Sequence, residues 1–183
     1  MKNCYLFLAD GFEEIEALTV VDLLRRDQLP IQMVSITGNE VVSGSHGIQV
    51  ITDCKIEDVD LNTASMLVLP GGMPGTENLY ANETLKGMLL DFHRSNRPIA
   101  AICAAPKILG RLGILEGKKA TCYPGCEGDL KGATVVKEEV VTDGNITTSR
   151  GMGTAIPFGL EIIRLLDNET EAAAMKTKIV YRQ

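Results

Sequence analysis

Tryptophan is absent from this chain of 183 residues, and phenylalanine and tyrosine contribute only four residues each. Nucleic-acid-binding surfaces use aromatic rings to stack bases and clustered basic residues to neutralise phosphates. The sequence has no run of lysine or arginine, and its formal net charge is -6. This composition argues against nucleic acid or an anionic membrane as a partner.

Long hydrophobic runs are also missing. The first apolar segment, residues 5–9, ends at Asp10 and is too short for a signal-peptide core or a membrane span. We therefore expect a cytoplasmic protein. Hydrophobic residues make up 45% of the chain and charged residues 23%, a balance that predicts one domain over residues 1–183.

Metal-binding and nucleotide-binding motifs are lacking as well. Five cysteines without a secretion signal predict reduced thiols rather than disulfides, and Cys122 and Cys126 have no second pair with which to hold zinc. Gly71-Gly72 lacks the Lys-Ser/Thr of a phosphate-binding loop, and no G-x-G-x-x-G follows a strand. The sequence therefore predicts neither a metal nor a cofactor.

Apolar runs alternate with helical patterns along the chain. Strands are expected at residues 3–9, 31–36, 66–69, 99–102, 119–123, 135–136, 140–141 and 146–148. Helices are expected at residues 13–27, 82–96 with Asn82 as N-cap, 106–112, 154–166 and 169–178. Residues 40–42 and 48–51 predict a small antiparallel excursion. The alternation predicts an α/β fold with a mostly parallel sheet covered on both faces.

The expected helix over 13–27 carries an apolar stripe. Ile15, Leu18, Val21 and Leu24 recur at helical spacing, and acidic residues occupy the first turn. This spacing predicts a helix with these residues on one stripe.

Cys103 stands where an expected strand becomes a helix. Pro106 fits the first helical turn, and Ala104 and Ala105 are small, as a sharp turn requires. Helix N–H groups facing the sulfur would favour a thiolate. A cysteine that only fills the core is the competing interpretation, because free cysteine is among the most buried residue types. This stretch alone leaves both interpretations open.

Sites in parallel α/β sheets form where the carboxyl ends of the strands meet. Three loops follow buried strands in this way: residues 10–16, 70–75 and 103–106. Gly71 and Gly72 have no Cβ, so their N–H groups, with that of Ala104, could form an oxyanion hole beside Cys103. A simple tight turn is the alternative explanation for the paired glycines.

Three acidic residues, Glu13, Glu14 and Glu16, open the first expected helix. Acidic residues are favoured there by the helix dipole whether or not they take part in chemistry. One of them could point toward the sulfur of Cys103. A carboxyl beside a thiolate must be protonated in order to donate a hydrogen bond, and the two groups would then share their titration.

The two histidines are weak candidates for activating the sulfur. His93 lies near the end of a helix that leads into the next strand, so it belongs to the opposite edge of the sheet, on a solvated helix. His46 lies in the expected hairpin turn and could reach the pocket from its own chain or from a partner, although turn placement alone also explains it. Tyr123 ends a strand and is a further possible pocket residue.

Four segments together resemble one known family. They are LADGFEEIE at 8–16, VLPGG at 68–72, AAICAAP at 100–106 and TSRGMGT at 148–154. In this order they resemble the ThiJ/PfpI family, which includes the Parkinsonism-associated deglycases and belongs to the class I glutamine amidotransferase-like superfamily. The resemblance implies a flavodoxin-like three-layer sandwich, a homodimer and a reactive cysteine.

The resemblance also implies roles for particular residues. Cys103 corresponds to the family's nucleophile and Glu16 to the protonated acid that touches it. Gly71, Gly72 and Ala104 match the segments that form the oxyanion pocket.

Other correspondences concern the pocket rim and the dimer. Ile15, Asp22, Arg26 and Arg150 fall in segments that approach the dimer contact in relatives. His46 occupies a position where relatives often carry arginine near the pocket.

Two departures from the family pattern restrict the function. Tyr123 stands where many relatives place a histidine near the cysteine, which puts histidine-dependent steps in doubt. Peptidase-like members have a histidine directly after the nucleophile, whereas Ala104 follows Cys103 here, so proteolysis is disfavoured.

The resemblance implies an enzyme that handles reactive carbonyls through a Cys103 hemithioacetal. Its substrates would be small aldehydes or glycated side chains, with either glyoxalase-type or deglycase chemistry and no cofactor. The alternative is an oxidative-stress sensor or chaperone-like protein that uses reversible oxidation of Cys103. A fold retained without chemistry is a third possibility.

Overall fold

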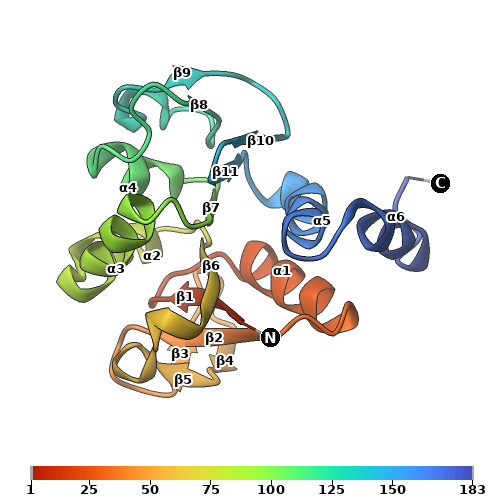
Figure 1. Ribbon diagram of the computed structural model, residues 1–183. Helices are drawn as coiled ribbons and strands as arrows, with labels where there is room; N and C mark the ends of the chain where they lie inside the picture. The colour runs from red at the N-terminus through yellow and green to blue at the C-terminus, as the bar shows by residue number, and fades with distance from the viewer. Residues whose placement is uncertain (1, 183) are drawn as a thin grey trace.

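A seven-stranded sheet forms the centre of the computed structural model, which describes residues 2–182 (Figure 1). The strand order is β10-β11-β7-β6-β1-β2-β5, and only β10 runs antiparallel to its neighbour. The strands are β1 (Asn3–Leu8), β2 (Ile31–Ser35), β5 (Cys54–Lys55), β6 (Ala64–Leu69), β7 (Ile99–Ile102), β10 (Val140–Asp143) and β11 (Ile146–Ser149).

Helices cover both faces of this sheet. One face carries α1 (Glu14–Arg26), α5 (Ala155–Leu166) and α6 (Glu169–Lys178), and the other carries α2 (Gly75–Ala81), α3 (Glu83–Arg94) and α4 (Pro106–Arg111) (Figure 1). Alternate residues of β1 enter the two cores: Phe7 packs on the α3 side, whereas Leu6 and Leu8 pack on the α1 side. The predicted flavodoxin-like three-layer α/β fold is confirmed.

Two small sheets lie outside the central one. β3 (Val41–Ser43) and β4 (Gln49–Ile51) pair antiparallel, which confirms the predicted excursion. β8 (Lys119–Ala120) pairs in parallel with β9 (Thr134–Val135). The predicted strand over 119–123 is therefore too long: the Thr121 N–H donates to the Thr148 hydroxyl at 2.9 Å instead of to a backbone ladder.

Short 3₁₀ turns connect several elements: η1 (Ile56–Asp58), η2 (Leu61–Thr63), η3 (Glu127–Asp129) and η4 (Met152–Thr154). The sequence patterns missed two of the regular elements. β5 has only two residues, and α2 follows a segment rich in proline and glycine that indicates a loop. The predicted N-cap of α3 is confirmed, because Asn82 accepts the Leu85 N–H at 2.9 Å.

The inward face of α1 matches the predicted stripe only in part. Val21 and Leu24 are buried as part of the core, but Ile15 is 50% exposed, and Ala17 and Val20 are buried instead. Because α1 packs against both the sheet and α5, its buried face is rotated and takes in acidic residues of the first turn. None of the helices in residues 2–182 has the length and apolarity needed to cross a membrane.

Candidate active site

Cys103 forms a strained turn between β7 and α4. Its φ of 65° lies in the left-handed region, which a residue with a Cβ adopts at a cost of about 1 kcal/mol or more. Two hydrogen bonds hold this backbone: the Cys103 N–H donates to the Ser149 carbonyl at 2.9 Å, and the Cys103 carbonyl accepts the Tyr123 N–H at 2.8 Å. These bonds hold the backbone in the left-handed conformation, which sets the direction in which the Cys103 side chain projects.

The sulfur of Cys103 is neither sealed in the core nor free in solvent. The residue is half-buried, and the N–H groups of Ala104 and Gly72 are directed at the sulfur. A Cβ built on Gly151 would lie 3.9 Å from this sulfur, so Gly151 leaves the space beside it open. Access for a small reagent and stabilisation of negative charge are thus combined at one atom.

Glu16 projects from the first turn of α1 toward the same sulfur. Its carboxyl is in hydrogen-bond contact with Cys103, although the residue is only 1% exposed. The Gly71 N–H donates to Glu16 Oε2 at 2.8 Å. This bond corrects one expectation, because the Gly71 N–H holds the acid in place and is not free to form an oxyanion hole.

Gly71 must be a glycine for this contact to form. A Cβ at this position would lie 2.6 Å from both Cys103 Cβ and Glu16 Oε2, far inside van der Waals contact. The loop after β6 therefore approaches the pair so closely that only backbone fits.

The pKa of the Glu16 carboxyl is raised to about 7, mainly because the group is buried. The nearby charge of Glu13 also raises this pKa, whereas hydrogen bonds with Cys103 and the Gly71 N–H lower it. Burial also raises the pKa of the Cys103 thiol, and so does the charge of Glu16. Two adjacent buried groups cannot both ionise readily, so the pair carries a single negative charge near neutral pH. Burial and Glu16 outweigh the N–H groups of Ala104 and Gly72 at the sulfur, so the expectation that these groups favour a resting thiolate is not met. The thiolate is the form of the pair in which Glu16 keeps the remaining proton.

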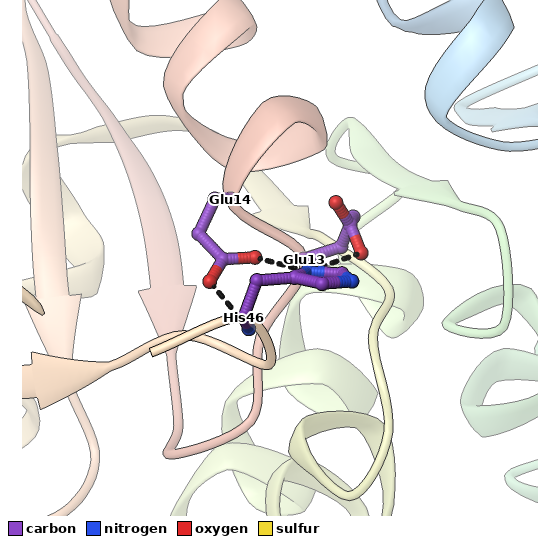
Figure 2. A group of neighbouring side chains, drawn as sticks. All are labelled: Glu13, Glu14 and His46. Atoms are coloured by element: carbon purple, nitrogen blue, oxygen red, sulfur yellow. Dashed lines mark hydrogen bonds and ion pairs between the residues drawn. The ribbon is translucent and has the colours of Figure 1, made fainter. Parts of the chain in front are cut away.

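His46 contacts acidic residues other than Glu16. In the loop between β3 and β4, its Nδ1 lies 3.0 Å from Glu14 Oε2 and 3.7 Å from Glu13 Oε2 (Figure 2). Its backbone N–H donates to Glu14 Oε1 at 2.7 Å, and the Ser45 hydroxyl donates to both carboxylates. His46 is thus placed next to Glu13, the residue that precedes α1, rather than on Cys103.

Glu13, Glu14 and His46 are also the residues with the spacing of a metal site. Within residues 2–182 they form a group whose possible ligand atoms lie within 4.8 Å of one another. The hydrogen bond between His46 and Glu14 and the ion pair between His46 and Glu13 already account for their proximity. The cysteine pair considered for zinc, Cys122 and Cys126, does not belong to such a group in the described chain.

Tyr123 lies at the mouth of the candidate site. It is 52% exposed, and its ring atom Cδ2 would contact a Cβ on Gly151 at 3.3 Å. His93, in α3, precedes β7 and so lies at the opposite edge of the sheet, as predicted. It is half-buried rather than solvated, and burial lowers its pKa.

Two features of the site were not anticipated from the sequence. Gly151 borders the sulfur, and the Ser45-His46 segment binds the carboxylate of Glu14. The only sequence signal for the contact between Ser45-His46 and Glu14 is Gly44, which precedes Ser45. In the structure, a Cβ on Gly44 would lie 2.2 Å from Glu14 Oε1. A glycine that permits such a close approach cannot be told from a turn glycine in a single sequence.

Comparison with known proteins agrees with this fold. A model of the DJ-1/PfpI family matches residues 2–165. Protein DJ-1 homolog B of Arabidopsis thaliana is 36% identical over 183 residues, and the match covers 99% of this chain but only 42% of that protein. The chain therefore spans less than half the length of that relative.

Two further similarities cover most of both partners. A protein named deglycase from Pyrococcus abyssi is 34% identical over 160 residues, which is 86% of this chain and 95% of that protein. A solved structure described as oxidized DJ-1 of Toxoplasma gondii has a TM-score of 0.95 and 32% identity and covers 100% of each chain.

Proposed function

Because this chain belongs to the DJ-1/PfpI family, we propose that it is a cofactor-independent cysteine enzyme that acts on reactive carbonyl compounds. The observation that carries the proposal is the contact between the Glu16 carboxyl and the Cys103 sulfur at a strained turn. The relative named deglycase supports carbonyl chemistry. Small aldehydes, or the adducts that they form on side chains, are the proposed substrates.

The first step is addition to a small dicarbonyl such as methylglyoxal. The Cys103 thiolate attacks the aldehyde carbon while Glu16 gives its proton to the carbonyl oxygen, and a hemithioacetal forms. The N–H groups of Ala104 and Gly72, which face the sulfur, stabilise the negative charge that develops beside it.

Proton transfer between the two substrate carbons completes the reaction. The Glu16 carboxylate removes the proton from the former aldehyde carbon and returns it to the neighbouring carbon, while the hydroxyl proton passes from the oxygen of the first carbon to that of the second. The first carbon is thereby oxidised and the second is reduced. The product is a thioester on Cys103. Water cleaves this thioester, releasing a hydroxy acid and restoring the thiol, so the net change is the addition of water and needs no external oxidant.

Replacement of the sulfur tests this proposal. Cys103→Ser is expected to lower the conversion of methylglyoxal to lactate at least about 1,000-fold, because an alkoxide does not form under these conditions. Cys126→Ser is the matched control, since Cys126 is another half-buried thiol, and it should retain full turnover. Circular dichroism and thermal unfolding verify that both variants fold. Undiminished turnover in Cys103→Ser would reject the mechanism.

A second candidate function is an oxidative-stress sensor with chaperone-like activity. It is favoured by the solved structure described as oxidized DJ-1, to which this chain is similar over its full length. Peroxide would convert the Cys103 thiolate to a sulfenate with release of water, and a second equivalent would give the sulfinate. Mass spectrometry after mild peroxide treatment should then show oxidation of Cys103 before Cys54 and Cys126. Uniform oxidation of the half-buried thiols would reject this candidate.

We further propose that the protein is a homodimer. Of the residues that the family resemblance assigns to the contact, Ile15 is 50% exposed, and Asp22 and Arg26 form a surface ion pair of 2.6 Å. Sedimentation velocity should therefore give a species of twice the 19.8 kDa chain mass. A monomer at all concentrations would contradict the proposal.

A further inference from the structure

The segment that carries His46 is fixed against the start of α1. The Ser45 N–H donates to the Phe12 carbonyl at 2.8 Å, and the His46 N–H donates to Glu14 Oε1 at 2.7 Å. Gly44 permits this approach, because a Cβ there would overlap the Glu14 carboxylate. The imidazole is therefore held in place by its backbone, although its side chain is 69% exposed.

The imidazole faces two carboxylates. His46 Nδ1 lies 3.0 Å from Glu14 Oε2 and 3.7 Å from Glu13 Oε2, and both distances suit an imidazolium between two negative charges (Figure 2). The groups that act on its charge are Glu14 and Glu13, which raise the pKa of His46, and Ser45 contributes a neutral hydroxyl. His46 is thus the titratable cation of this cluster.

Glu13 links this cluster to the Cys103–Glu16 pair. The Glu13 N–H donates to the Gly71 carbonyl at 2.9 Å, and the Gly71 N–H donates to Glu16 Oε2 at 2.8 Å. The charged groups that act on Glu16 are Cys103 and Glu13. A negative charge on Glu13 opposes ionisation of the pair, and a cation beside Glu13 offsets that charge.

We propose that His46 is a positioning residue whose charge, acting through Glu13, sets how readily the Cys103–Glu16 pair releases its first proton. Protonated His46 neutralises Glu13 and favours the anionic pair, whereas neutral His46 leaves Glu13 uncompensated and favours the fully protonated pair. The thiol would then respond to pH through its own ionisation and through that of His46.

This inference rests on the proposed function for the location of the reactive thiol, but its test needs no substrate. The measured quantity is the rate of Cys103 alkylation by iodoacetamide from pH 5 to pH 9.5, followed by mass spectrometry. Loss of carbonyl turnover would reject the enzyme and leave this measurement unaffected. Labelling of Cys126 in the same samples reports any general change in the fold.

Two variants fix the charge of the imidazole position. His46→Arg supplies a permanent cation, and His46→Gln supplies a neutral side chain that can still bond to Glu14. The midpoint of alkylation should be about 0.5 pH unit lower in His46→Arg than in His46→Gln, a difference of about threefold in rate below both midpoints. Wild type should follow His46→Arg at acidic pH and His46→Gln at alkaline pH.

The same pair of variants in a Glu13→Gln background tests whether the charge of residue 46 acts on the Cys103–Glu16 pair through Glu13. The difference between arginine and glutamine should shrink to within error there, because the intermediate charge is gone. Equal midpoints for His46→Arg and His46→Gln, or a difference that persists without Glu13, would overturn the proposal. If Glu13→Gln does not fold, the two single variants decide the outcome by themselves.

Discussion

Glu14 and Glu16 lie two residues apart on α1, are 3% and 1% exposed, and yet titrate in opposite directions. Burial raises the pKa of both carboxyls. For Glu14 the effect is reversed by hydrogen bonds, first from the His46 side chain and then from backbone N–H groups and the Ser45 hydroxyl, which lower the pKa to about 2. Glu16 receives the single N–H of Gly71 and keeps a pKa of about 7.

The comparison shows that the number of donors and the depth of burial together decide what a carboxyl can do here: Glu14 has several donors near the surface, whereas Glu16 has few donors in a more deeply buried position. Glu14 is a permanent anion that binds a loop, because its oxygens already have their partners. Glu16 has one backbone donor and a sulfur as neighbours, so it can gain and lose a proton near neutral pH.

The largest expected effect separates the two carboxyls by activity. Glu16→Gln should lower carbonyl turnover by about 100-fold to 10,000-fold, because the amide cannot exchange the proton that the mechanism moves. Glu14→Gln should leave most of the turnover but lower the free energy of unfolding by about 1–3 kcal/mol, since charged hydrogen bonds are lost. The measurements are lactate formation and urea unfolding. Equal turnover losses in the two variants would remove the distinction.

The next prediction concerns the pH dependence of stability. The unfolded chain releases the Glu16 proton near the ordinary value of 4.5, whereas the folded chain keeps it to about 7. The unfolded state therefore binds fewer protons over this interval, and the free energy of unfolding should fall by about 3 kcal/mol as pH rises from 4.5 to 7. Urea unfolding should show this fall in wild type, and Glu16→Gln should lack it.

Glu14 should give the opposite slope at lower pH. Its pKa is lowered in the folded state, so its contribution to stability is present above pH 4.5 and is lost as pH falls toward about 2. Glu14→Gln should flatten the curve in this range and, above about pH 6, should also reduce the fall in stability that comes from His46, whose pKa Glu14 raises. A single slope for both variants would mean that the two carboxyls share one environment.

The smallest effect tests the close approach that separates Glu16 from solvent. Gly71→Ala should lower the free energy of unfolding by about 1–3 kcal/mol, because its Cβ would overlap Cys103 and Glu16. Gly87→Ala is the matched control: this glycine is exposed in α3, a Cβ meets nothing within 4 Å, and alanine should stabilise the helix by up to about 1 kcal/mol. Thermal unfolding compares the melting temperatures of the two variants. An unchanged melting temperature in Gly71→Ala would show that the loop after β6 can shift to accommodate the Cβ.

Several features of the fold follow from local sequence patterns. The runs that became β1, β6 and β7 are apolar and bounded by turn residues, so the mostly parallel sheet could be predicted. The junction at Cys103 was visible for the same reason, since a buried strand ends there and Pro106 begins a helix. The resemblance to a known family assigned Glu16 to the cysteine, but the local pattern offered three acidic residues without distinguishing them.

The sequence by itself determined most of the strands and helices, although not β5 or α2, and hence that Cys103 lies at the carboxyl edge of a parallel sheet. Only the tertiary structure decided the rotation of α1, which turns Glu16 toward the sulfur and Glu14 toward the His46 loop. The physical reason is the distance along the chain over which each kind of interaction acts. Backbone preference and hydrophobic period act over a few neighbouring residues, whereas a carboxyl acquires its pKa from groups that packing brings together from distant parts of the chain.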